Sequence, residues 1–372
     1  MYYLLISRNV FFDNNDQIRS EIPELFQAVQ DKEIQVVIVT RSSTKYKKIV
    51  DEELPDYDIK FGNRGNLSRK VFDEIYSNVM LIGAVDEDIR IAANNKILLV
   101  NPLWIPDVEP NIEKYGFQLK NFSQIVQCID ILKLDCELFY DFQIDDKTRL
   151  IAVSNANKYY AVENEQEMIS KYMKTLKYGN RNYRYAVYFH YLTMIYGMKE
   201  FRDVDLWMAV PSSSGSNDNN IYDIVKRTRY LLNNRKSKDL FIRHKPAQKS
   251  TYMDKSDRVI QGCKRHLDTI HLNPYYKGKL KGKKICVLDD YTTYGPSFES
   301  VRNLLIKEGV NEIILVAIGT FQKEYYKEEY EIIGDTYSQG FTYELKEKTR
   351  IVGESNEMAT AMINDIYKII NS

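Results

Sequence analysis

The sequence predicts an α/β protein made of two Rossmann-like domains, each with a mainly parallel sheet. The chain has 372 residues, enough for two domains that each bury a core. Short apolar runs alternate with amphipathic segments, an order typical of strands and helices in parallel sheets. A stretch containing Tyr and Asp near residues 135–145 separates the two halves. We therefore expect one domain at residues 1–137 and a second at residues 138–372.

The composition argues against several classes of protein. The 52 basic side chains balance the 52 acidic ones, so net charge does not indicate binding to nucleic acid or to an anionic membrane. The longest apolar run, Ala186–Met198, is too short to span a bilayer and contains His190. The chain does not open with a charged segment followed by an apolar one, and we expect no signal peptide. The cysteines form no C-x-x-C pair, which favours buried thiols in a reducing cytoplasm.

The N-terminal half is predicted to alternate strands with helices. We expect four short buried strands, at Tyr2–Ile6, Val36–Thr40, Val79–Gly83 and Ile97–Val100. We expect five helices, at Ser20–Gln30, Tyr46–Glu53, Ser68–Tyr76, Asp86–Asn94 and Phe122–Leu132. This order gives a parallel sheet with helices on both faces. The segment Leu103–Glu137 is expected to end the domain.

Three stretches of this half resemble the haloacid-dehalogenase (HAD) hydrolases. Val36-Val-Ile-Val-Thr40 resembles a strand that ends in the family's phosphate-binding Thr. Lys70 lies where the family keeps its Lys, and Asp88 matches the second acid of the family's last motif. Ser7 and Asn9, however, occupy the places of the Asp-x-Asp pair that such enzymes need for the nucleophile and for Mg²⁺.

The resemblance therefore implies a HAD-like domain without phosphatase activity. Such a domain would bind a phosphorylated ligand or a protein partner. The alternative is a plain Rossmann-like fold in which Thr40, Lys70 and Asp88 are ordinary surface residues.

The second half begins with a predicted hairpin and two helices. Leu138–Gln143 and Arg149–Val153 are expected to be the strands of a small hairpin. A helix at Glu165–Thr175 then leads through Leu176-Lys-Tyr-Gly-Asn-Arg181 to a long apolar helix that ends near Tyr196. We expect the next strand at Asp205–Val210.

A serine-rich loop follows that strand. Its predicted phosphate-binding residues are Ser212, Ser213, Ser214 and Gly215. Small residues let backbone N–H groups approach oxyanions, although such a turn is often just a solvated loop. The helices and the motif between them resemble the ComF-type phosphoribosyltransferases. In that family this loop grips the pyrophosphate of phosphoribosyl pyrophosphate (PRPP).

A polar and basic segment, Arg243–Arg258, follows a helix at Ile221–Asn233 and a strand at Asp239–Ile242. It lacks apolar periodicity, and ComF-type proteins have a similar loop here. The resemblance implies a lid that closes over PRPP and brings Arg243, Lys245 or Lys249 to the leaving pyrophosphate. The alternative is a solvated linker.

The most informative stretch is Lys284–Ser300. Ile285–Leu288 is predicted to be a buried strand, Asp289 and Asp290 follow it, and an amphipathic helix begins after a Thr/Tyr/Gly/Pro loop. N–H groups at a helix start bind phosphate, and carboxylates accept hydrogen bonds from a sugar diol. The alternative is a capped turn with two solvated acids.

This stretch resembles the PRPP signature of type I phosphoribosyltransferases. The match covers Asp289, Asp290, Thr293, Gly295 and Ser297, where Ser replaces the final Thr of the signature. Tyr294 departs from the family, which usually has a second Thr there. Thr292 and the turn residues would bind the 5′-phosphate. After this helix we expect a strand at Asn311–Ile318, an irregular segment at 321–350 and a closing helix at Glu354–Ile370.

These resemblances imply a phosphoribosyltransferase that uses PRPP and a nucleobase-like acceptor. Mg²⁺ would be carried by PRPP, with no metal ligand from the protein itself. Asp289, Asp290, Arg243 and Lys245 are the predicted catalytic residues. The alternative is a non-catalytic PRPP or nucleotide sensor, or an assembly protein, in a bacterial stress, defence or DNA-uptake system. A homodimer and a complex with a partner protein both stay open.

Overall fold

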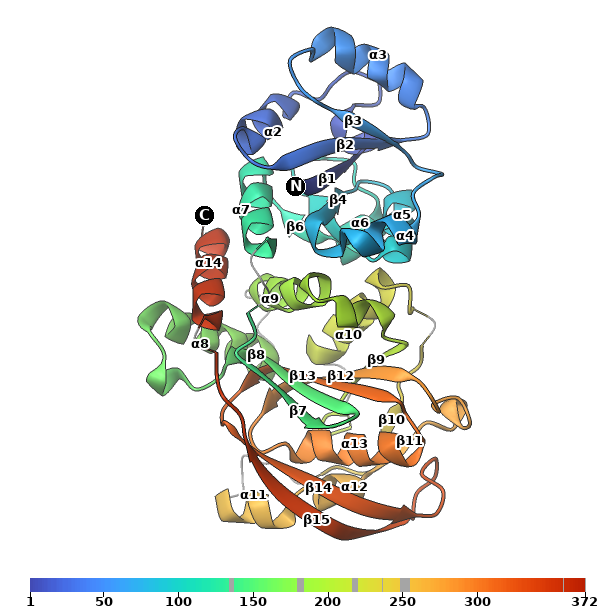
Figure 1. Ribbon diagram of the computed structural model, residues 1–372, viewed down its shortest axis with the longest axis vertical. Coiled ribbons are helices and arrows are strands. Elements are labelled where there is room, and N and C mark those ends of the chain that lie inside the picture. The colour runs from blue at the N-terminus through green and yellow to red at the C-terminus, as the bar shows by residue number, and fades with distance from the viewer. Residues whose placement is uncertain are drawn as a thin grey trace.

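The computed structural model describes residues 1–133, 137–178, 184–215, 220–235, 237–247, 255–356 and 358–371. It confirms the predicted α/β class, with one all-parallel sheet and one mixed sheet (Figure 1). The first sheet ends with β6 at Leu119, and the second begins with β7 at Tyr140.

The N-terminal sheet has six parallel strands in the order β3-β2-β1-β4-β5-β6. Its strands are β1 (Tyr2–Ser7), β2 (Ile34–Thr40), β3 (Lys60–Asn63), β4 (Val79–Ile82), β5 (Leu98–Pro102) and β6 (Phe117–Leu119). Its helices are α1 (Arg8–Phe11), α2 (Ile22–Val29), α3 (Ser43–Glu53), α4 (Arg69–Glu74), η1 (Tyr76–Asn78), α5 (Asp86–Asn95), α6 (Pro110–Tyr115) and α7 (Phe122–Leu132). The strand order reverses between β1 and β4, where the carboxyl ends of parallel strands commonly form a ligand crevice.

The second sheet has the order β7-β8-β13-β12-β9, in which β7 alone runs antiparallel to its neighbour. Its strands are β7 (Tyr140–Asp145), β8 (Thr148–Asn155), β9 (Leu206–Ala209), β12 (Lys284–Thr292) and β13 (Glu312–Thr320). Two antiparallel pairs lie outside it: β10 (Phe241–Arg243) with β11 (Ile270–Leu272), and β14 (Glu324–Ile333) with β15 (Thr342–Val352).

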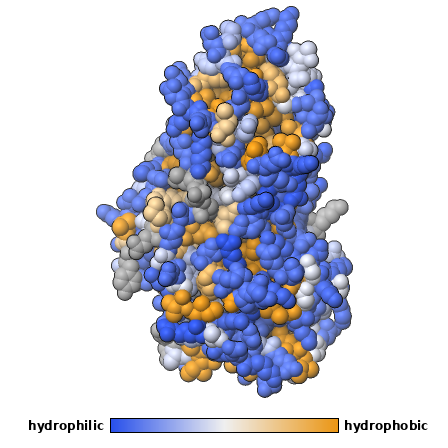
Figure 2. Space-filling model, in the orientation of Figure 1, coloured by the Kyte–Doolittle hydropathy of each residue, from blue (hydrophilic) through white to orange (hydrophobic). Residues whose placement is uncertain are grey.

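The helices of the second half cover both faces of this sheet. They are η2 (Lys158–Tyr160), α8 (Glu163–Tyr178), α9 (Arg184–Gly197), η3 (Lys199–Asp203), α10 (Asn220–Leu231), α11 (Lys255–Gln261), α12 (Lys264–Leu267), η5 (Pro274–Tyr276), α13 (Pro296–Lys307) and α14 (Ala359–Asn371). Helices α9 and α10 lie between the two sheets, whereas α13 and the β14–β15 hairpin lie on the far side (Figure 1). Figure 2 shows hydrophilic side chains over most of this face of the molecule.

Two predictions about this half were wrong. The predicted hairpin forms, since β7 and β8 pair antiparallel, but it is not a small separate element because β8 also pairs in parallel with β13 inside the main sheet. The segment 321–350 was expected to be irregular, whereas it forms most of the β14–β15 hairpin. The sequence of β14, Glu-Tyr-Tyr-Lys-Glu-Glu-Tyr-Glu-Ile-Ile, has no regular alternation of apolar and charged residues, so no period of two indicates this strand.

Strand β12 is also longer than predicted. Its pairing with β13 continues past the two acids, with Tyr291 opposite Gly319 and Thr292 opposite Thr320. The acid pair therefore lies within the last half of a paired strand rather than in the loop after it. This position holds the backbone of both acids rigidly at the carboxyl edge of the sheet.

Candidate functional site

The site lies where β9 ends beside the last half of β12. Leu288 pairs with Ala209, and the amide of Val210 donates to the carbonyl of Leu288 at 2.9 Å. The serine-rich loop that starts at Pro211 therefore leaves the sheet beside Asp289. Parallel pairing thus brings together two segments that are separated by more than 70 positions in the sequence.

The acid pair is ordered by its own backbone. Asp289 Oδ1 accepts from the amide of Asp290 at 2.8 Å, and Asp290 Oδ1 accepts from the amide of Tyr291 at 2.6 Å. Both residues are half-buried. The pKa of the Asp289 carboxyl is raised well above its ordinary value, mainly by burial and to a lesser extent by the charge of Asp290. The charge of Lys177 opposes this rise.

Lys177 was not predicted as a site residue. It lies in the last turn of α8, where its ammonium forms an ion pair with Asp290 and sits 5.5 Å from the centre of the Tyr291 ring. The sequence motif that begins at Leu176 included it, but nothing in that motif indicated a contact with Asp290. This ion pair connects α8 to the end of β12.

The turn Thr293–Ser297 leads directly into α13. Gly295 has φ +88°, and a Cβ there would overlap the ring of Tyr325, so both backbone and space require glycine. The amide of Glu299 donates to the carbonyl of Gly295 at 2.9 Å and begins the helical ladder. The amides of Ser297 and Phe298 precede this bond and have no acceptor within the helix. Such amides provide donors for an anion.

Two other predicted phosphate ligands lie differently. Thr292 is buried as the last residue of β12, paired with Thr320. The ring of Tyr294 is buried and packs edge-on against Tyr326 of β14, with ring centres 5.9 Å apart. The amide of Tyr326 also donates to the carbonyl of Tyr294 at 3.1 Å. Both side chains therefore support the turn rather than line it.

The serine-rich loop is closed by its own hydrogen bonds. Gly215 has φ +80°, and its amide donates to the carbonyl of Ser212 at 3.0 Å. The hydroxyl oxygens of Ser212 and Ser214 lie 3.1 Å apart. The carbonyl of Ser213 accepts from the amide of Ala247 at 2.9 Å, which ties this loop to the start of the predicted lid.

Arg243, a predicted catalytic residue, lies beside this loop at the end of β10. Its Nη2 donates to the carbonyl of Pro211 at 3.0 Å, and its Nη1 donates to the hydroxyl of Thr269. Burial lowers the pKa of Arg243 to about 10, so the guanidinium stays cationic at neutral pH. Lys245 is exposed. Lys249, the third predicted cation, and residues 248–254 of the predicted lid lie outside the described residues.

His266 joins the two halves of the site and was not predicted. Its Nδ1 lies 3.5 Å from Nη2 of Arg243, and its Nε2 lies 3.4 Å from the hydroxyl of Ser297. Burial, with the charges of Arg265 and Arg243, lowers the pKa of His266 to about 3. The imidazole is therefore neutral. It lies between the guanidinium of Arg243 and the hydroxyl of Ser297, a predicted phosphate ligand. Its role arises from tertiary contacts, and no sequence spacing indicates it.

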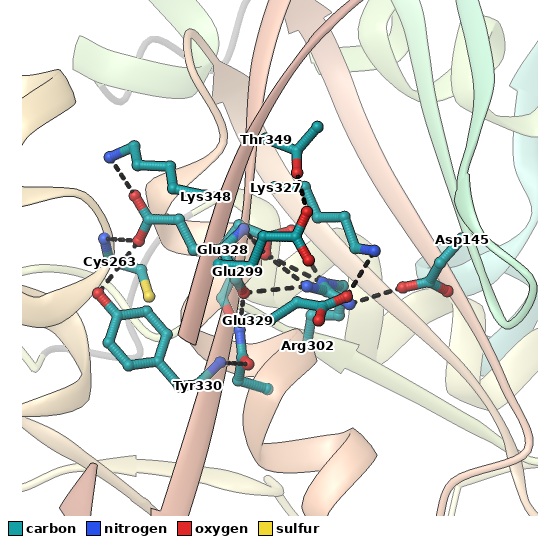
Figure 3. Close-up of polar contacts among 12 residues, drawn as sticks. Asp145, Cys263, Glu299, Arg302, Lys327, Glu328, Glu329, Tyr330, Lys348 and Thr349 are labelled. Carbon is teal, nitrogen blue, oxygen red and sulfur yellow. Dashed lines mark hydrogen bonds and ion pairs between the residues drawn. The ribbon is translucent and has the colours of Figure 1, made fainter. Parts of the chain in front are cut away.

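Helix α13 is anchored by a buried ion pair (Figure 3). Arg302 Nη2 lies 2.8 Å from Oε2 of Glu299, and neither side chain is more than 1% exposed. Arg302 Nη1 also lies 2.6 Å from Asp145 on β7. Glu299 accepts from the hydroxyl of Tyr325 and from the amide of Glu328 at 2.8 Å. The helix that carries the phosphate turn is thereby fixed to β7 and β14.

Two residues of the HAD-like resemblance, Ser7 and Asp88, come together at the carboxyl ends of the paired strands β1 and β4. The carboxylate of Asp88 is buried and accepts from the amides of Ala84 at 2.9 Å and Val85 at 3.1 Å. Arg64, which was not predicted, forms an ion pair with Asp88 and donates to the hydroxyl of Ser7 at 3.1 Å. Burial raises the pKa of Asp88, and the charge of Arg64 opposes this.

The other three residues of that resemblance differ in exposure. Thr40 is buried and accepts from the amide of Ser42 at 3.1 Å, while Asn9 is half-buried. Lys70 is exposed on α4, and Arg64 is the cation that contacts Asp88. Asp88 and Thr40 are therefore not the surface residues that the plain Rossmann alternative expects.

Comparison with known proteins gives no family for the chain. The sequence matches no protein-family model and no curated protein. Within the residues that the structure describes, no group of three or more His, Cys, Asp or Glu could hold a metal ion. No described helix is both long and apolar enough to cross a membrane.

Proposed function

We propose that the protein is a phosphoribosyltransferase that binds PRPP with Mg²⁺ and exchanges pyrophosphate for a nucleobase-like acceptor. One observation carries this proposal. The acid pair, the Thr293–Ser297 turn and the serine-rich loop, three segments that the PRPP resemblance assigned to one ligand, converge at the ends of β9 and β12. A capped turn with two solvated acids gives no reason for this convergence.

Each part of the site has a defined task in this proposal. Asp289 and Asp290 accept hydrogen bonds from the ribose hydroxyls, and the amides at the start of α13 bind the 5′-phosphate. The serine-rich loop and Arg243 bind the pyrophosphate. Mg²⁺ typically binds substrate phosphates, and there it would neutralise the leaving group.

The reaction is a displacement at C1 of the ribose. A bond forms between C1 and an acceptor nitrogen while the bond from C1 to the pyrophosphate oxygen breaks. Positive charge on the ring develops next to the acid pair, where fixed carboxylates stabilise it. The pyrophosphate leaves with both electrons of the broken bond, towards Arg243, and takes up the proton that the acceptor nitrogen loses.

A non-catalytic PRPP sensor is the second candidate, and the ion pair of Lys177 with Asp290 bears on both candidates, since both bind ribose there. A carboxylate already paired with an ammonium accepts a ribose hydroxyl only by sharing or breaking that pair. The buried Tyr294 ring does not support the sensor, since it packs against Tyr326 instead of facing the solvent.

For the N-terminal domain we propose binding without phosphatase activity. The Ser7 hydroxyl stands in place of a nucleophilic carboxylate, and Arg64 already neutralises Asp88, where an active enzyme needs acids for a metal. The ligand of this domain is a phosphorylated molecule or a protein partner. We assign the chain to the cytoplasm.

Pyrophosphate release tests the main proposal. The wild-type chain is mixed with PRPP, Mg²⁺ and each of the common nucleobases in turn, and released pyrophosphate is measured enzymatically. Phosphoribosyl transfer is supported if pyrophosphate release requires one particular base and if Arg243→Ala lowers that release at least tenfold. PRPP binding without release for any base favours the sensor, and the absence of PRPP binding contradicts both.

A further inference from the structure

An exposed lysine-rich segment lies between β11 and β12. Residues 277–284 read Lys-Gly-Lys-Leu-Lys-Gly-Lys-Lys and hold five lysines and no acid, although the whole chain has 52 basic and 52 acidic side chains. Lys277, Lys279 and Lys281 are exposed. A short run this rich in lysine is typical of surfaces that bind polyanions. The balanced net charge of the chain conceals this local excess of positive charge.

The fold adds a lysine from a separate part of the chain. Lys238 lies shortly before β10, where the Tyr276 hydroxyl donates to its carbonyl at 2.7 Å and accepts from its amide at 2.9 Å. The Lys238 ammonium lies 4.4 Å from the centre of the Tyr275 ring, and the Lys279 ammonium lies 3.9 Å from the same centre. The ring therefore holds two cations from two segments together. We call Lys238, Tyr275, Lys279 and Lys281 the lysine patch.

Neighbouring acids leave the charge of this patch uncompensated. Two lysines beside it are neutralised, Lys277 by Asp335 at 2.9 Å and Lys283 by Asp205 at 2.8 Å. The three lysines of the patch itself form no ion pair with any residue that the structure describes. Two like charges held over one ring repel each other, and a bound anion removes that repulsion.

The patch is distant from the proposed substrate site. The lysine-rich segment ends at Lys284, the first residue of β12, whereas Asp289 and Asp290 lie in the last half of that strand. At about 3.3 Å per residue, the strand places about 17 Å between Lys284 and Asp289. A ligand on the lysine patch is therefore separate from PRPP, and both can be bound at the same time.

We propose that the lysine patch binds the phosphate backbone of a single-stranded nucleic acid. The ammonium groups neutralise phosphates, which is the main source of affinity in such complexes. Tyr275 is 43% exposed, and a base can stack on its ring when one of the two ammonium groups turns to a phosphate. An acidic protein segment would use the lysines but has no base to stack on this ring. The inference goes beyond the proposed transferase activity and does not depend on it.

Fluorescence anisotropy tests this inference. A labelled oligothymidylate of about 20 nucleotides, longer than the sites that single-strand-binding proteins cover, is titrated with the wild-type chain. The titration is repeated at several salt concentrations between about 50 and 200 mM. A triple variant, Lys238→Gln with Lys279→Gln and Lys281→Gln, removes three charges from the patch. The matched control changes three exposed lysines of the N-terminal half to Gln: Lys47, Lys48 and Lys120.

We expect the oligonucleotide to bind the wild type, with an affinity that falls as the salt concentration rises. For single strands, the slope of log K against log [salt] is about −0.7 per phosphate neutralised, so the triple variant should flatten the slope by about 2. The triple variant should also weaken binding at least tenfold. Tyr275→Leu should weaken binding by about fivefold or more, because base stacking is lost. The control should change neither the slope nor the affinity.

Polyglutamate and vesicles of phosphatidylserine and phosphatidylcholine in equal parts are the competing probes. The inference is overturned if the oligonucleotide does not bind the wild type at about 50 mM salt, or if the control loses as much affinity as the triple variant. It is also overturned if polyglutamate or the vesicles bind through the three lysines and the oligonucleotide binds less tightly. The patch would then serve an acidic protein or a membrane surface.

Discussion

Three ionisable side chains give the site its electrostatic character: His266 is buried, and Asp289 and Arg243 are half-buried. Burial raises the pKa of Asp289, lowers that of Arg243 to about 10 and lowers that of His266 to about 3. At neutral pH the site therefore holds a guanidinium and a neutral imidazole around the turn that we assign to phosphate. His266 can accept from Arg243 or from Ser297 without adding a charge.

This arrangement predicts a loss of stability in acid. The folded pKa of His266 is about 3 and the unfolded value about 6.5, so the unfolded chain binds more protons between these values. The contribution is complete above pH 6.5 and is lost as the pH falls towards 3. At pH 5 about 2 kcal/mol of this contribution has been lost.

Urea denaturation at pH 7.5 and pH 5.0 measures this effect. Between the two conditions His266→Gln should lose about 1–2 kcal/mol less stability than the wild type. His271→Gln, at a histidine outside the site, is the control and should lose as much as the wild type. If all three proteins lose the same stability between pH 7.5 and pH 5.0, the assignment of His266 as a neutral, buried imidazole is contradicted.

At the scale of elements, α13 depends on its buried ion pair more than on its sequence propensity. Glu299 is fully buried and bonded to Arg302, Tyr325 and the amide of Glu328. Removing one partner of such a pair leaves an uncompensated buried charge, at a cost of about 3–5 kcal/mol.

Glu299→Ala should therefore lower the free energy of unfolding by about 3–5 kcal/mol. Arg350→Ala, which breaks the exposed pair between β15 and Glu324 of β14, should cost less than about 1 kcal/mol. Denaturant titration of both variants measures the contrast. Similar small losses in both would mean that the β14 hairpin does not anchor α13.

Local sequence patterns predicted most helices and strands. The strands that were missed are either too short to show a pattern or depend on tertiary pairing. The helix at Phe122–Leu132 has the predicted bounds because its apolar spacing is regular. The short strands β3 and β6 were missed, since four and three residues carry too little pattern. The end of β12 was missed because its pairing with β13 overrides the acids and the threonine there.

The functional site was predicted only in part, because only some of its residues belong to local sequence motifs. Asp289, Gly295 and the serine-rich loop belong to local motifs, and these could be read from the sequence. Lys177, His266 and Arg64 act through contacts with residues 113, 31 and 24 positions away, which no local spacing encodes.

At the scale of the whole molecule, the helices that surround the two sheets share one packed junction. Arg202 on η3 contacts Asp73 on α4 at 2.6 Å and donates to the carbonyls of Asn95 at 3.0 Å and Lys96 at 3.1 Å. The rings of Tyr115 and Tyr230 stack with centres 3.8 Å apart, across the same junction. One apolar cluster of buried residues includes side chains from both sheets and from the helices between them.

We therefore expect the chain to unfold in one cooperative calorimetric transition. Arg202→Ala should lower its midpoint by several degrees, because it removes a buried cation and three of its contacts. Arg69→Ala, which removes the more exposed contact with Asp203, should shift it far less. Two separate transitions in the wild type would contradict a common core.

The measurement that tests the account most directly is PRPP binding to the double variant Asp289→Asn with Asp290→Asn. Both acids are half-buried at a strand end, so the fold should persist with a nearly unchanged melting temperature. Each charge-assisted hydrogen bond from a ribose hydroxyl contributes roughly 1.5–3 kcal/mol, and roughly 1.4 kcal/mol corresponds to a factor of ten. Calorimetry with PRPP and Mg²⁺ should therefore show binding to the wild type and an affinity at least about a hundredfold weaker in the variant. Equal PRPP affinity in the two proteins would contradict the assignment of this site.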